Sequence, residues 1–259
     1  MFFVLVFSLV FYQLKLTMAQ TKYPEFEAIE VQLAENAPTF KYRLLKPLGW
    51  DSQDSSQKYP LLLCLHGAGE RGSDNEITLT HFAPWLLAKN NRKPFPCFVF
   101  VPQCEKSFRW VEVDWTWDTH TQPTEISVYL GYTMQVLEQL LKKYPIDEKR
   151  IYVTGLSMGG FGTWDLITRF PEKFAAAVPI CGGGDETVAY KAKNVPIWAF
   201  HGALDKLVKP ERSRNMIQAL QKAGGKPKYT EYPQVGHDCW KNAYQEPTLL
   251  PWLFEKRKN

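Results

Sequence analysis

The fold of this chain is decided by residues 150–162, which read Arg150-Ile151-Tyr152-Val153-Thr154-Gly155-Leu156-Ser157-Met158-Gly159-Gly160-Phe161-Gly162. The β-branched and aromatic run at 151–154 predicts a short buried strand. It leads directly into Gly-x-Ser-x-Gly, and residues 161–169 have the pattern of a helix. Strand, sharp turn and helix in this order are the context that a nucleophile elbow requires.

The small residues of this turn have a physical role. A sharp turn that pushes Ser157 outward brings the flanking backbone together, so side chains at Gly155 and Gly159 would collide. The following helix directs its first N–H groups at the serine, where they favour negative charge. Because glycine and serine are common, the bare motif is a weak signal, and a serine that only caps the helix is the alternative. The strand and helix around it favour Ser157 as a nucleophile.

Outward from this turn, strand patterns alternate with helix patterns. Strands are predicted at 59–66, 96–101, 174–181, 195–201 and 228–232, with helices at 80–89, 124–144 and 210–223. Residues 240–256 are predicted to be partly helical, and 27–33 and 39–45 to form two antiparallel edge strands. This alternation is typical of a mostly parallel sheet that helices cover on both faces. Ligands of such sheets lie beyond the carboxyl ends of the strands.

The first twenty residues differ from the rest of the chain. Met1–Leu16 carries an apolar block that is short for a membrane span, which needs about 20 apolar residues. Thr17-x-Ala19 then fits a cleavage site. We therefore predict a signal peptide at 1–20, a single domain at 21–259, and a secreted or periplasmic protein with no stable membrane association after cleavage. No Lys or Arg precedes the block, so a retained anchor is the alternative.

Composition narrows the classes of function. The chain has 259 residues, 45% of them hydrophobic, which is enough for a substantial core. The net charge of +4 is spread along the chain and gives no support to nucleic-acid binding. The five cysteines form no metal-ligand spacing, so no metal site is predicted. In an exported protein they leave room for one disulfide among Cys104, Cys181 and Cys239.

Two polar residues follow later strands of the predicted sheet. Asp205 comes after the strand at 195–201, and His237 after the last strand. The order serine, aspartate, histidine is that of the α/β-hydrolase triad. His237 would take the proton of Ser157 during attack, and Asp205 would hold the imidazole in one tautomer. Asp238 is a competitor for this orienting role, but an adjacent aspartate reaches its neighbour's Nδ1 poorly.

The other four histidines are not predicted to take part in catalysis. His66 and His201 each open a His-Gly turn and are expected to shape it, whereas His81 and His120 are expected to lie in a helix and a loop without partners.

The oxyanion of a tetrahedral intermediate needs two N–H donors. We predict that the backbone of Met158 supplies one and the backbone of Ala68, in the glycine-rich loop after the strand at 59–66, supplies the other. A plain tight turn is the alternative for this loop. A phosphate site is disfavoured because the lysine and Ser/Thr of a P-loop are missing.

Four motifs follow one another along the chain, and together they resemble those of the secreted carboxylesterases of the α/β-hydrolase superfamily. They are Leu65-His66-Gly67-Ala68-Gly69-Glu70-Arg71-Gly72, Gly155-Leu156-Ser157-Met158-Gly159-Gly160, His201-Gly202-Ala203-Leu204-Asp205 and Val235-Gly236-His237. More narrowly they resemble the branch of dienelactone hydrolases, polyhydroxybutyrate-depolymerase-like esterases and family 1 carbohydrate esterases, over residues 40 to 255. The resemblance implies a core of about eight strands and serine esterase chemistry without metal or cofactor. Dienelactone hydrolases proper use cysteine at the elbow, so Ser157 does not imply lactone opening.

The resulting expectation is a serine carboxylesterase that acts through an acyl-enzyme on short acyl or plant-cell-wall-linked esters. Feruloyl or acetyl xylan esterase activity, or peptidase activity, is the narrower alternative, and a catalytically silent binding protein on the same fold is the non-enzymatic one. Trp110, Trp117 and Trp240 are candidate contacts for sugar rings or hydroxycinnamoyl groups, although tryptophans near strand ends are more often packed. The expected partner is a small or carbohydrate-linked ester.

Overall fold

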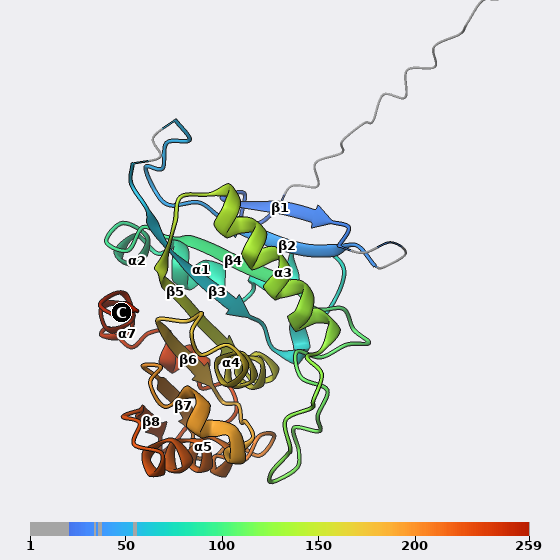
Figure 1. Cartoon of the computed structure of the whole chain (residues 1–259), viewed down its shortest axis with the longest axis vertical. Coiled ribbons are helices and arrows are strands. Elements are labelled where there is room, and N and C mark those ends of the chain that lie inside the picture. The colour runs from blue at the N-terminus through green and yellow to red at the C-terminus, as the bar shows by residue number, and fades with distance from the viewer. Residues whose placement is uncertain (1–20, 34, 36–37, 54–55, 259) are drawn as a thin grey trace, which may run out of the picture.

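The computed structural model describes residues 21–33, 35, 38–53 and 56–258, and the signal peptide predicted at 1–20 lies outside them. The described residues contain one sheet, whose strand order is β1-β2-β4-β3-β5-β6-β7-β8. Figure 1 shows this sheet running from β1 at one end of the molecule to β8 at the other. The strands are β1 (Phe26–Val31), β2 (Phe40–Leu45), β3 (Tyr59–Leu65), β4 (Phe98–Gln103), β5 (Ile146–Leu156), β6 (Ala176–Ile180), β7 (Trp198–Gly202) and β8 (Lys228–Tyr232).

Most neighbouring strands are parallel. β2 pairs antiparallel with both β1 and β4, and every pair from β4 onward to β8 is parallel. The prediction of a mostly parallel sheet of about eight strands is confirmed. The prediction that residues 39–45 form an edge strand is wrong, because β4 pairs along the second side of β2.

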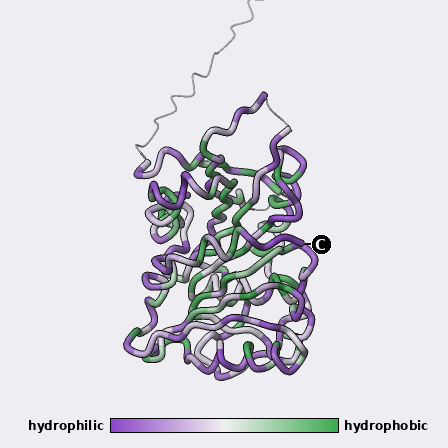
Figure 2. The backbone as a smooth tube through the Cα atoms, turned by 90° about the vertical axis from the view of Figure 1, so that its left-hand side faces the viewer, coloured by the Kyte–Doolittle hydropathy of each residue, from purple (hydrophilic) through white to green (hydrophobic). Residues whose placement is uncertain are grey.

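The central strand β3 is buried on both faces. Leu61, Leu63 and Leu65 lie in one hydrophobic core, whereas Leu62 and Cys64 lie in a second core on the other face. Two-sided burial explains why this segment is continuously apolar and does not alternate with polar residues. Figure 2 shows the hydrophobic stretches inside the molecule and the hydrophilic ones along its outer turns.

Helices cover both faces of the sheet. The core that contains Leu63 is covered by α3 (Val128–Lys143), α4 (Met158–Arg169) and α5 (Glu211–Lys222). The core that contains Leu62 is covered by α1 (Phe82–Leu87) and α7 (Leu249–Phe254). The short helix α2 (Lys89–Arg92) follows α1, and the short helix α6 (Trp240–Ala243) precedes α7. Short 3-10 helices lie at Ala68–Glu70, Ile77–Leu79 and Glu186–Ala192.

Two predicted helices have different limits in the structure. The helix expected at 124–144 begins at Val128, because the Ser127 hydroxyl accepts the Leu130 N–H at 3.2 Å and caps it. The helix expected at 80–89 is interrupted at Ala88, whose ψ of 131° is extended and separates α1 from α2. Both corrections move helix ends without changing the order of the elements.

All five cysteines are buried and free. The disulfide that the sequence left room for among Cys104, Cys181 and Cys239 is therefore not formed. Burial raises the pKa of the Cys104 and Cys181 thiols well above the usual value, with Cys239 adding to the rise at Cys181. Thiols of this kind are chemically inert packing groups.

Among the described residues, no group of three or more His, Cys, Asp or Glu side chains is arranged to hold a metal ion. The same residues include no helix with the length and apolar character that crossing a bilayer requires.

Candidate active site

Ser157 lies between β5 and α4 on a strained turn. Its φ of 53° and ψ of −117° are rare for a residue with a side chain, and such strain is characteristic of functional sites. The Ser157 N–H donates to the Ile180 carbonyl of β6 at 2.9 Å. A Cβ at Gly155 would collide with the Gly159 backbone, and a Cβ at Gly159 with the carbonyl of Leu65. The close backbone approach predicted for these two glycines is confirmed.

The side chains of Ser157, His237 and Asp205 form one hydrogen-bonded series. His237 Nε2 is 2.8 Å from Ser157 Oγ, and His237 Nδ1 is 2.7 Å from Asp205 Oδ2. Asp238 instead forms an ion pair with Lys241 at 2.6 Å. The structure therefore brings together the three residues that the sequence selected from separate strand ends, and leaves Asp238 outside the series.

Asp205 is held from several sides. Its Oδ1 accepts the N–H groups of Leu207 at 2.9 Å and Val208 at 3.0 Å, and its Oδ2 lies 3.2 Å from Nε2 of the buried His201. Burial raises the pKa of Asp205, but hydrogen bonds from His201, His237 and Val208 outweigh it and hold the pKa well below its ordinary value. Asp205 is therefore a fixed carboxylate at neutral pH.

The contact between His201 and Asp205 was missed in the sequence, where His201 was only expected to shape its turn. The available signal was the spacing of four residues between His201, near the end of β7, and Asp205, in the turn that follows this strand.

In the loop after β3, side chains form hydrogen bonds with the backbone groups of successive peptide units. The His66 carbonyl accepts the indole N–H of Trp110 at 2.9 Å. In the same peptide unit, the Gly67 N–H donates to Glu70 Oε2 at 2.9 Å. Glu70 stands three residues after Gly67, which is the spacing of a capping box, so the sequence contained this signal although Glu70 was not selected. His81, expected to lack a partner, lies 3.3 Å from Glu70 Oε1.

His66 fixes the next peptide unit. Its Nε2 accepts the Cys104 N–H at 3.0 Å, so the ring proton is on Nδ1, which donates to the Gly67 carbonyl at 2.7 Å. Burial lowers the pKa of His66 to about 4, so the ring is neutral. The Ala68 carbonyl in turn accepts the Nε–H group of Arg71 at 3.0 Å.

Among the described residues, the backbone amides of Ala68 and Met158 are not engaged in hydrogen bonds, unlike the neighbouring Gly67 and Ser157 amides. Within the described part of the chain, neither N–H has a hydrogen-bond acceptor. The Gly67–Ala68 unit is trans, so its N–H points away from the carbonyl that His66 holds. The loop also packs against the elbow, because Gly67 abuts Leu156 and Gly159 abuts the end of β3. Both amides therefore have an unused donor in the part of the chain that the structure describes.

The three tryptophans have different environments. Trp110 is 0% exposed, so its prediction as a substrate contact is wrong. It is buried because its indole N–H anchors the His66 carbonyl. Trp117 is 62% exposed. Trp240 packs its ring edge-on against His237, with centroids 5.5 Å apart. Of the three, Trp240 contacts the hydrogen-bonded series.

His120 also has a partner that the sequence did not reveal, since Nδ1 is hydrogen bonded to the Arg212 guanidinium.

Comparisons with known proteins agree with this geometry. Residues 116–246 match the model of the dienelactone hydrolase family. A crystal structure of a thermostable esterase is similar to this chain with a TM-score of 0.83 and 37% sequence identity, covering 91% of this chain and 64% of that one. This similarity confirms the expected α/β-hydrolase fold.

Sequence relatives are more distant. An uncharacterized secreted protein of Arthroderma benhamiae is 28% identical over 225 residues, which are 72% of this chain and 22% of the relative. A bifunctional acetylxylan esterase/xylanase of Neocallimastix patriciarum is 33% identical over 105 residues, which are 40% of this chain and 15% of the relative. The chain spans less than two thirds of the length of each of these proteins.

Proposed function

The chain belongs to the dienelactone hydrolase family of α/β-hydrolases, and on that premise we propose that it is a serine carboxylesterase with Ser157 as nucleophile. The observation that carries the proposal is the hydrogen-bonded series from Ser157 through His237 to Asp205. A hydroxyl becomes an effective nucleophile when a positioned base removes its proton and a third group orients that base. Serine at the elbow favours hydrolysis of open-chain esters over the lactone chemistry of cysteine-containing relatives.

Acylation is the first half of the reaction. Ser157 Oγ forms a bond to the ester carbonyl carbon while its proton passes to His237 Nε2. The carbonyl oxygen becomes an oxyanion that accepts the N–H groups of Ala68 and Met158. When the intermediate collapses, the carbon–oxygen bond to the alcohol breaks and the alcohol leaves with the proton from His237.

Deacylation repeats these steps with water. His237 takes a proton from the water as its oxygen attacks the acyl carbon, and then returns the proton to Ser157 Oγ as the acid leaves. Asp205 remains ionised throughout and stabilises the imidazolium that forms twice per cycle. Its lowered pKa fits this role. No metal or cofactor is needed by this scheme.

We propose short acyl or plant-cell-wall-linked esters as substrates. Acetyl xylan is a narrower candidate, favoured by the relative named as an acetylxylan esterase/xylanase. We also propose that residues 1–20 are removed as a signal peptide and that 21–259 act as one domain outside the cytoplasm. The relative named as a secreted protein supports export.

The test is hydrolysis of p-nitrophenyl acetate by the wild type, Ser157→Ala and Ser73→Ala, which alters an exposed serine. We expect Ser157→Ala to lose several orders of magnitude in kcat and Ser73→Ala to match the wild type. Unchanged turnover in Ser157→Ala would refute the nucleophile. No turnover in the wild type across acetyl, feruloyl and xylan-linked esters would favour a binding protein instead.

A further inference from the structure

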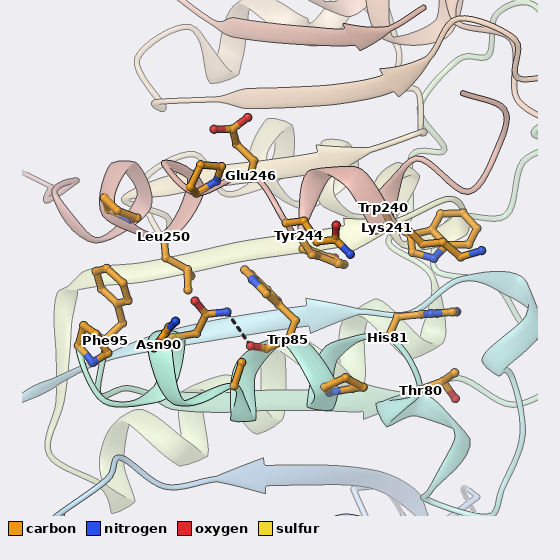
Figure 3. Close-up of a pocket in the computed structure, with 17 residues that line it drawn as sticks. Thr80, His81, Trp85, Asn90, Phe95, Trp240, Lys241, Tyr244, Glu246 and Leu250 are labelled. Atoms are coloured by element: carbon orange, nitrogen blue, oxygen red, sulfur yellow. Dashed lines mark hydrogen bonds between the residues drawn. The ribbon is translucent and has the colours of Figure 1, made fainter. Parts of the chain in front are cut away.

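A groove of about 770 Å³ lies on one face of the sheet, between the α1–α2 segment and the α6–α7 segment. Figure 3 shows its two walls, with Trp85 and Phe95 on one side and Tyr244 and Leu250 on the other. This volume lies in the range of sites that hold small organic ligands, about 300–1,000 Å³. Neither Ser157 nor His237 lines the groove, and the mechanism above does not use it.

One end of the groove abuts the candidate active site. His81 and Trp240 line this end, with ring centroids 5.3 Å apart (Figure 3). Trp240 packs on His237, and His81 contacts Glu70, which holds the Gly67 amide. The groove therefore starts between the histidine loop and the loop that carries the Ala68 amide. An ester whose carbonyl lies on Ser157 has these two loops on either side of it.

The walls of the groove present mostly apolar surface. Trp85 and Tyr244 stack on each other with centroids 4.3 Å apart and are both buried against the sheet. Phe95 and Leu250 extend this surface away from the active site, and prolines from both segments complete it. A surface of this kind gains free energy by covering apolar area.

Most polar side chains of the groove are already occupied. The exceptions among the described residues are the amides of Asn90 and Gln245, which have no hydrogen-bond partner, and the buried indole nitrogen of Trp240, which also has none. The Thr80 hydroxyl donates to the Ile77 carbonyl at 2.6 Å, and Asn91 Nδ2 donates to the Trp85 carbonyl at 2.8 Å.

The two charged groups are likewise engaged, Lys241 with Asp238 at 2.6 Å and Glu246 with the Thr248 hydroxyl at 2.7 Å. A sugar chain requires free donors and acceptors for its hydroxyls, because buried unpaired polar groups are costly. With only Asn90, Gln245 and the Trp240 indole unengaged along a mostly apolar lining, the groove offers a sugar chain few partners and suits an uncharged apolar chain better.

We propose that this groove binds an elongated apolar arm of the ester substrate, so that kcat/KM rises with the length of that arm. An arm on the alcohol side is compatible with the short acyl group proposed above, whereas an arm on the acyl side would replace that short acyl group by a longer one. The inference rests on the proposed esterase function. The arm belongs to the acyl group or to the alcohol, which share the same apolar chemistry, and the experiment separates these two sources. Each methylene that enters the groove should raise kcat/KM about fourfold.

The experiment compares the wild type with Ala88→Trp. Ala88 is exposed at the rim of the groove, so an indole there fills the groove without disturbing the core. Ala28→Trp is the matched control, because Ala28 is exposed on β1, at the edge of the sheet. Two substrate series are used: p-nitrophenyl acetate to octanoate, and ethyl to octyl acetate.

We expect wild-type kcat/KM to rise by tenfold or more along one series, which identifies the arm. Ala88→Trp should remove this rise and leave the shortest ester within about twofold, and Ala28→Trp should keep it. A flat wild-type profile in both series, or a uniform loss in Ala88→Trp, would overturn the inference without touching the esterase proposal.

Binding of 1-octanol, measured by calorimetry, tests the groove independently of turnover. We expect the wild type and Ala28→Trp to bind it and Ala88→Trp to bind at least tenfold more weakly. Equal binding by all three proteins, or none, would contradict the inference even if every ester were left intact.

Discussion

Replacing Trp110 with phenylalanine isolates the hydrogen bond that anchors the loop after β3. The indole N–H donates to the His66 carbonyl at 2.9 Å, and the side chain is fully buried. Phenylalanine keeps an aromatic ring but leaves this carbonyl without its donor, which costs about 1–3 kcal/mol. The smaller ring also loses packing contacts, and this loss has to be separated from the cost of the unpaired carbonyl.

Trp164→Phe provides the matched control. Trp164 is equally buried, and within the described residues its indole nitrogen has no hydrogen-bond partner. The same substitution there removes ring volume but no hydrogen bond. We therefore expect Trp110→Phe to lower the free energy of unfolding by about 1–3 kcal/mol more than Trp164→Phe, as measured by urea denaturation.

Turnover gives a second measure of the same perturbation. Removal of a whole oxyanion donor typically costs 10²–10³ in kcat, and a loosened loop should cost less. We expect Trp110→Phe to lower kcat on p-nitrophenyl acetate about tenfold with little change in KM, because an oxyanion donor, the role proposed for the Ala68 amide, acts mainly in the transition state. Equal stability and equal kcat for the two variants would refute the assignment of Trp110 as the anchor.

Three further outcomes are expected. His66 is neutral in the folded protein because its pKa is about 4, whereas the pKa of an unfolded histidine is about 6.5. The unfolded chain therefore takes up an extra proton as pH falls, and the free energy of unfolding should drop by about 2 kcal/mol from pH 7 to 5. Urea titrations should find this contribution missing in His66→Asn. Gly159→Ala should disrupt folding, because its Cβ would enter a backbone carbonyl, whereas Gly69→Ala, with open space around it, should melt like the wild type in calorimetry. Asp205→Asn should lower kcat about 10⁴-fold and Asp238→Asn should not, and equal rates would contradict the contact of Asp205 with His237.

The sequence was sufficient to predict a mostly parallel sheet and the residues that meet beyond the carboxyl ends of its strands. Parallel strands end at one edge, so polar residues placed directly after strands converge there. Ser157, Asp205 and His237 each follow a strand, and the structure places them in contact. Their convergence needed no knowledge of how the helices pack.

The errors arose where tertiary contacts decide the outcome. Trp110 lies in a loop without periodicity, and whether its indole faces solvent or the His66 carbonyl depends on how that loop folds over β3. The break at Ala88 had no local signal, because alanine has the highest helix propensity. The groove lies between segments about 150 residues apart in the sequence, so only their packing creates it.

Covalent labelling distinguishes an activated nucleophile at Ser157 from an ordinary serine side chain. The folded protein is treated with a fluorophosphonate, digested, and analysed by mass spectrometry, with heat-unfolded protein as the control. We expect a single adduct on the peptide that contains Ser157, formed only by the folded protein. An unlabelled Ser157, or an adduct on a different serine, would contradict it.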